Sequence, residues 1–202
     1  MQNPVLDITK LVLQDDMSDN ASGADNQQER LSIDSIPIAI GNFLSGFALG
    51  EGSFMIVCRP RVDYRRGWKV SAAFNVSQAD VTPLELFREQ LGCGTIRRAG
   101  NDGWYLEVNS LGDIQSSVIP FFRRFPMVGR KAIDFELFEA AAGILARRPL
   151  TDSDYREVLR LREELNRGGK RRYTMERILR DYTPNSPGEL RRDEIVRSHG
   201  RP

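Results

Sequence analysis

The chain of 202 residues is 40% hydrophobic and 28% charged, which is typical of a globular domain in water. It contains no run of about 18 apolar residues and no basic start followed by an apolar stretch, so the sequence predicts neither a membrane span nor a secretory signal. Two cysteines, Cys58 and Cys93, have no disulfide-framework pattern and no metal-ligand spacing. We expect both to be buried, reduced thiols in an intracellular protein, in a bacterial cytoplasm or an organelle.

The net charge of +1 conceals an uneven distribution along the chain. Residues 1–40 carry two basic and seven acidic side chains, whereas the remaining 162 residues carry 27 basic and 21 acidic ones. A basic body behind an acidic leader fits a polyanionic partner, although a modest basic excess is also typical of a solvated surface.

The first half of the chain predicts an extension, a helix and a hairpin. Residues 1–35 are acidic and polar, and we expect a disordered extension with a short helix near residues 8–13. Residues 36–50 are apolar or small over about four helical turns, with Pro37 near the start. Residues 53–61 and 68–78 alternate with a period of two, which predicts the two strands of a hairpin.

A second helix and hairpin follow. Residues 82–92 predict a helix with Asp80 or Thr82 as its N-cap and Gly92 at its end. Residues 94–100 and 104–110 predict two strands around a turn at residues 101–103.

The rest of the chain predicts helices. Residues 111–125 form one that bends or restarts at Pro120, and residues 151–168 form one opened by a capping interaction of Thr151 with Asp154. Residues 171–202 predict a basic and polar tail with a short helix at 175–181. The helix over residues 129–148 has one apolar side, made of Ile133, Leu137, Phe138, Ala141 and Leu145.

This order of elements predicts an α+β fold in which helices cover one face of a four-stranded antiparallel sheet. The other sheet face would be polar and basic. It is typical of a solvated sheet surface, but long donors on a two-stranded ribbon can also reach base edges in a DNA groove. Its predicted residues are Met55, Arg59, Arg61, Lys69, Ser71, Asn75 and Arg97.

One short motif resembles the signature of a known protein family. The stretch "LSGFALGEG" at residues 44–52 resembles the signature of LAGLIDADG homing endonucleases, and "AFNVSQ", "LGCGTI", "VIPFF" and "FPMVGRKAIDFELFEA" follow it as in that family. The resemblance covers about residues 40–170, within an endonuclease domain expected over residues 36–170, and it implies a saddle-shaped four-stranded sheet. The sequence contains one copy of the motif, and this resembles the single-motif members that act as homodimers with the motif helices side by side.

The resemblance implies a set of site residues. Glu51 would bind Mg²⁺, with Mn²⁺ as a substitute, and the carbonyl of Gly50 would be a further ligand. Gln78 matches a polar residue that orients solvent around the metal. Lys131 or Arg130 would supply a basic group at the active site.

The resemblance also implies the contact between subunits. The small and apolar residues Leu44, Ser45, Gly46 and Ala48 would allow two motif helices to pack closely. The sequence departs from the family pattern at Leu49, where the family usually has an acidic residue.

The function that follows is a Mg²⁺-dependent, site-specific endonuclease that makes a double-strand break in a long, near-palindromic DNA target and promotes intron mobility. It needs no small-molecule cofactor and no membrane. His199, the only histidine, lies in the tail, so a histidine triad or a zinc site is not expected. The alternatives are a non-cleaving DNA-binding regulator or an RNA-splicing maturase on the same fold, and an interaction protein without a nucleic-acid partner.

Overall fold

A computed structural model describes residues 32–181, apart from residues 65, 101, 102, 148, 168 and 170. The predicted extension over residues 1–31, its short helix near residues 8–13 and the tail beyond residue 181 lie outside the described residues. Of the helices in the described ranges, none is long and apolar enough to cross a membrane.

The sheet has four antiparallel strands in the order β1-β2-β4-β3. In β1–β2 pairing, Gly52 lies opposite Val76 and Pro60 lies opposite Trp68. Both predicted hairpins are therefore confirmed, and β2 and β4 form the centre of the sheet. The strands are β1 (Gly52–Pro60), β2 (Trp68–Gln78), β3 (Thr95–Ala99) and β4 (Gly103–Val108).

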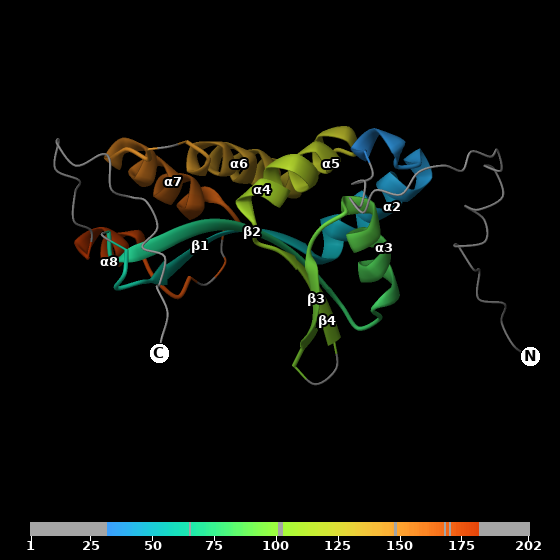
Figure 1. Ribbon diagram of the computed structural model, residues 1–202, viewed down its shortest axis with the longest axis horizontal. Coiled ribbons are helices and arrows are strands. Elements are labelled where there is room, and N and C mark those ends of the chain that lie inside the picture. Colours follow the sequence, from blue (N-terminus) through green and yellow to red (C-terminus); the bar gives the residue numbers. More distant parts are fainter. Residues whose placement is uncertain are drawn as a thin grey trace, which may run out of the picture. The chain divides into compact units, whose positions relative to one another are not determined.

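Helices cover one face of this sheet, which confirms the α+β fold. Figure 1 shows α4 to α7 as a layer over β1 and β2, while the other face of these two strands carries no such layer. The helical elements are η1 (Ile33–Ser35), α2 (Ile38–Glu51), α3 (Thr82–Leu91), α4 (Leu111–Asp113), η2 (Ile114–Val118), α5 (Ile119–Arg124), α6 (Gly129–Leu145), α7 (Asp152–Glu164) and α8 (Met175–Arg180).

The core between the two layers is aromatic. The ring of Phe54 on β1 lies 5.0–5.5 Å, centroid to centroid, from the rings of Phe74, Phe122, Phe135 and Phe138. These rings come from β2, α5 and α6, and tilted and edge-on pairs are the favoured aromatic geometries. One ring on β1 therefore ties the sheet to the helices above it.

The helix over residues 111–125 continues through Pro120 by changing its winding. Residues Ile114–Val118 form a π-helical turn, in which the N–H of Ile119 donates to the carbonyl of Ile114. Pro120 has no N–H and cannot continue an α-helical ladder, and a wider turn is a known way to absorb such an interruption.

Helix α6 buries the predicted apolar side except at Ile133. Phe138, Ala141 and Leu145 are buried as expected, but Ile133 is 47% exposed. Each helical residue advances by about 100°, so Ile133 points away from Phe135, which lies in the aromatic core two residues later. Leu137 is partly buried against this core.

Two predicted helix ends are confirmed, and one is shifted. Thr151 and Asp154 form a complete capping box at α7, and the hydroxyl of Thr151 holds the pKa of the Asp154 carboxyl below its usual range. Gly92 ends α3 in the left-handed conformation, with φ of 63°. Helix α3 starts after Val81, and Asp80 accepts from the N–H of Thr82 at 3.0 Å.

A second, smaller cluster lies at the end of the sheet where α7 and α8 pack. It contains Cys58, Trp68, Tyr155, Leu159 and Ile178, so the predicted short helix near residue 175 is confirmed and is docked on the sheet. Both cysteines are free, with Cys58 buried and Cys93 partly buried. Burial raises the pKa of the Cys58 thiol to about 11, which keeps it protonated at neutral pH.

The two helical glycines Gly41 and Gly143 should respond oppositely to alanine. A Cβ on Gly41 would overlap the buried ring of Phe125, whereas one on Gly143 would meet nothing within 4 Å. We expect Gly41→Ala to lower the free energy of unfolding by about 1–3 kcal/mol, and Gly143→Ala to raise it by up to about 1 kcal/mol. Urea denaturation measures both. Equal effects of the two substitutions would contradict the packing described for α2.

Candidate active site

The motif helix α2 ends at an exposed carboxylate. Glu51 is its last residue, and Gly52 begins β1 directly afterwards. Because Gly52 lies opposite Val76, the end of β2 at Gln78 comes to the same end of the sheet as Glu51. The side-chain oxygen of Gln78 accepts from the N–H of Ala79 at 2.8 Å. The structure therefore brings Glu51 and Gln78, 27 positions apart in the sequence, to one end of the β1–β2 pair.

Lys131 and Arg130 point to different places. The ammonium of Lys131 donates to the carbonyl of Gly52 at 2.6 Å, which holds it one residue away from Glu51. Arg130 instead lies 3.0 Å from the Asp134 carboxylate and donates to the carbonyl of Glu164 at 2.7 Å. The structure thus brings Lys131 to the end of the motif helix and uses Arg130 to tie α6 to α7.

The end of α2 offers oxygen ligands in a negative field. The last carbonyls of a helix lack intrahelical partners and carry a partial negative charge, and here the Glu51 carboxylate adds a full one. Oxygen ligands of this kind suit a hard divalent cation such as Mg²⁺. Within the described residues, no three His, Cys, Asp or Glu side chains gather as a metal cage.

The predicted contact residues of the motif helix lie on two different sides of it. Leu44, Ser45 and Ala48 are buried in the chain's own core, and the Ser45 hydroxyl donates to the carbonyl of Phe125 at 2.8 Å. Of the four predicted residues, only Gly46 is exposed. The three buried side chains therefore serve the packing of one chain, and their predicted contact with a second chain stays a prediction.

Beyond the first turn of α2, where Ile38 and Ala39 are also exposed, a strip of mostly small and apolar residues lies on its exposed side, and the prediction did not identify it as one surface. It consists of Asn42, Phe43, Gly46, Leu49 and Gly50, which we call the α2 strip. Phe43 is 45% exposed, and a Cβ on Gly46 or on Gly50 would meet nothing within 4 Å. The spacing of Asn42, Gly46 and Gly50 by four residues is the sequence signal that could have located it.

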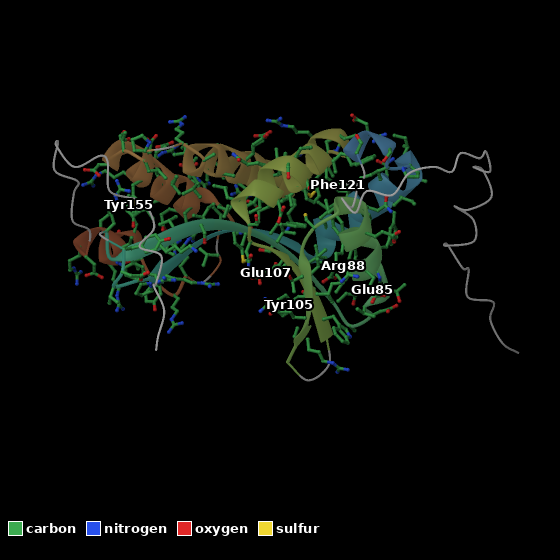
Figure 2. The ribbon with its side chains drawn as sticks, in the orientation of Figure 1. Glu85, Arg88, Tyr105, Glu107, Phe121 and Tyr155 are labelled. Carbon is green, nitrogen blue, oxygen red and sulfur yellow. The ribbon has the colours of Figure 1, made fainter. Side chains whose placement is uncertain are left out.

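The predicted polar residues share the open face of the sheet. Phe54, Ile56, Phe74 and Val76 point to the core, so the residues between them point the other way. Figure 2 shows Tyr105 and Glu107 on this side, away from the helical layer that contains Phe121. Met55, Ser71 and Asn75 are half-buried there, and Arg59, Lys69 and Arg97 are exposed.

Basic side chains gather at one end of the open face. Arg59 on β1 lies opposite Lys69 on β2. Arg61, in the turn after β1, donates to the Asp63 carboxylate at 2.7 Å, and this bond lowers the pKa of Asp63. A shallow hollow joins this end to the middle of the sheet, and its lining residues are Val57, Arg59, Arg61, Lys69, Ser71, Ala73, Glu107 and Asn109.

Comparisons with known proteins agree with this arrangement. The model of the LAGLIDADG endonuclease family matches residues 44–142, about half the chain. An uncharacterized 50.9 kDa protein in ND4 intron 1 of Podospora anserina is 32% identical over 103 residues, which are 49% of this chain and 23% of the relative. Probable intron-encoded endonuclease 3 of Neurospora crassa is 30% identical over 96 residues, which are 46% and 18% of the two chains. The chain thus spans less than a quarter of the length of these two relatives.

Solved structures share the fold. The homing endonuclease I-TnaI is 26% identical with a TM-score of 0.61, and the match covers 70% of this chain and 94% of that one. The meganuclease I-SmaMI bound to uncleaveable DNA is 29% identical with a TM-score of 0.61, and the match covers 67% of this chain and 46% of that one. The predicted endonuclease fold is therefore confirmed.

The structural role of Arg130 can be measured by its removal. Arg130→Ala removes the ion pair of the buried Asp134 carboxylate and leaves its hydrogen bond from the N–H of Asn166, at 3.0 Å. We expect the free energy of unfolding to fall by about 1–3 kcal/mol. The matched variant Arg123→Ala breaks an exposed ion pair with Glu139 and should cost about 0.5 kcal/mol. Equal urea midpoints for the two variants would be inconsistent with the role given to Arg130.

Proposed function

We propose that this chain, which belongs to the LAGLIDADG endonuclease family, is a divalent-metal-dependent enzyme that cuts both strands of double-stranded DNA as a homodimer. One observation supports this most strongly. An exposed carboxylate, Glu51, stands at the end of a helix whose free side is the small and apolar α2 strip.

The α2 strip is suited to a second copy of itself. Helix axes approach closely only where the facing side chains are small, and Gly46 and Gly50 provide that contact next to the apolar groups of Phe43 and Leu49. In a two-fold dimer the same surface packs on its own copy. Two α2 helices side by side would bring two Glu51 carboxylates together, which completes a site that one chain supplies only in part.

Leu49 has a place in this arrangement. It stands where the resemblance implies an acidic residue, and it is 36% exposed on the α2 strip. A leucine there adds apolar surface to the proposed contact. The metal-binding role stays with Glu51, two residues later.

The proposed cofactor is Mg²⁺, with Mn²⁺ as a substitute. The Glu51 carboxylate and the Gly50 carbonyl would hold it, and when bound it supplies a Lewis acid that stabilises negative charge on the scissile phosphate. The ammonium of Lys131, anchored on the Gly52 carbonyl, adds positive charge beside the phosphate. The amide of Gln78 orients solvent at the end of β2.

The open face of the sheet is the proposed DNA surface. Arg59, Lys69 and Arg97 are exposed donors along it, and long basic side chains neutralise phosphates or reach base edges in the major groove. A two-fold dimer reads two symmetric half-sites, so the target is long and near-palindromic. The I-SmaMI structure holds DNA, and two Neurospora crassa relatives are named as probable intron-encoded endonucleases. We extend DNA binding and an intron-encoded origin to this chain. Inside a cell or organelle, its cleavage of DNA would promote the mobility of an intron.

Replacement of Glu51 tests the chemistry. The full chain is incubated in Mg²⁺ with a supercoiled plasmid library that carries randomised inserts, and the linear products are sequenced. Glu51→Gln keeps the shape of the side chain but removes its charge, so we expect cleavage of the recovered target to fall by about 100-fold or more while DNA binding persists. Glu136→Gln, on the exposed side of α6, should cut like the parent. Equal binding and no cutting by all three proteins would favour a non-cleaving regulator or a splicing factor.

Replacement of Gly46 tests the dimer. A leucine at Gly46 has free space in the chain itself, so the fold should survive while the close approach of two α2 helices is blocked. We expect sedimentation to show dimers for the parent and monomers for Gly46→Leu. Gly143→Leu places the same side chain at another open helical glycine, on α6, and should remain dimeric. Monomeric parent protein at micromolar concentration, or dimers of Gly46→Leu, would refute this contact.

A further inference from the structure

A single carboxylate occupies the middle of the open face. Glu107 lies on the inner strand β4, opposite Asn75 on β2 and Thr95 on β3. Leu106 and Val108, its neighbours in sequence, are buried in the core, so its side chain points to the open side, where Figure 2 shows it. A carboxylate at the centre of a surface proposed for DNA is unexpected, because it repels the negatively charged phosphates.

Charge on this face is arranged from the rim to the centre. Arg59 and Lys69 lie at the far end of the β1–β2 pair, and Arg97 lies on the edge strand β3. The positions nearest Glu107 across the strands are uncharged, namely Asn75 and Thr95. The phosphates of a duplex on this face would lie against the cations. Its base edges would lie against the short polar groups and the one acid.

The Glu107 carboxylate is not neutralised by an ion pair among the described residues. In the described ranges, none of the salt bridges that the structure shows includes it. The Asn109 amide donates to one of its carboxylate oxygens at 3.3 Å, a bond that orients the group without neutralising it. The carboxylate therefore lines the hollow of the open face and can accept further hydrogen bonds.

The chemistry of base edges selects a partner for such a group. A carboxylate repels phosphates, so it weakens sequence-independent binding and is useful only where it accepts a hydrogen bond from a base. In the major groove the amino donors are cytosine N4 and adenine N6, and adenine places the acceptor N7 beside its amino group. That lone pair opposes a carboxylate, whereas cytosine presents its amino group without an adjacent acceptor on the same base.

We propose that Glu107 accepts a hydrogen bond from the N4 amino group of a cytosine and determines specificity at that base pair in each half-site. The inference rests on the proposed function, since it requires DNA on the open face. It goes beyond that function because it assigns one residue to one base. Contacts of Arg59, Lys69 and Arg97 with phosphates would position the duplex, and Glu107 would recognise the base.

The test uses the full chain and a library of duplexes with randomised sequence, selected for binding in EDTA so that cleavage plays no part. The bound sequences are read for the parent, for Glu107→Gln and for Glu136→Gln. We expect the parent to select C·G at one position per half-site, and Glu107→Gln to lose that preference by about tenfold while the other positions are unchanged. A glutamine pairs with adenine N6 and N7, so the variant should turn toward A·T there. Glu136→Gln should give the parent's profile.

The remaining outcomes separate failure of the inference from failure of the proposed function. If Glu107→Gln binds every duplex more tightly with an unchanged profile, Glu107 only repels phosphates, and the inference fails while DNA binding stands. If the parent selects no duplex, the inference fails together with the proposed DNA partner. If the parent selects duplexes but never cuts them in Mg²⁺, only the proposed cleavage fails.

Discussion

The packing of Phe54 is the constraint on which the rest of the structure depends. Its ring contacts aromatic rings from β2, α5 and α6, and it lies three residues after Glu51. With this ring fixed in the core, the residues just before it are held near the same point, namely Gly52 at the start of β1 and Glu51 at the end of the motif helix. The aromatic core thus sets the position of the exposed carboxylate, and Lys131 reaches the same point from α6 because Phe135 and Phe138 anchor that helix on Phe54.

The motif helix has two sides with different tasks. One side, with Leu44, Ser45 and Ala48, is buried and joins the helix to its own domain. The α2 strip on the other side is mostly small and apolar, and it is exposed in the described part of the chain. A helix that is apolar on all sides is normally buried all round, so the exposed strip is suited to contact with another surface. In the proposed dimer, a second copy would supply such a surface, and it would also supply the second carboxylate.

Local signals in the sequence were enough for most of the fold. Strand β2 matches its predicted bounds, and the capping box of α7 was readable because its two partners lie three residues apart. The inward side of α2 was not readable, since apolar residues surround the whole helix and no periodicity separates Leu44 from Gly46. Neither was the choice between Arg130 and Lys131, because neighbours on a helix diverge by about 100° and only the packing of α6 shows which one faces the motif.

The central claim, that two chains share one cleavage site, is tested most directly by subunit mixing. The parent and Glu51→Gln are unfolded together in urea at known ratios, refolded, and assayed in Mg²⁺ for double-strand breaks in the selected target. If both carboxylates of a dimer are required, the rate of linearisation falls as the square of the parent fraction. A rate that falls in simple proportion to the parent fraction would mean that each chain cuts alone, and would contradict the shared site.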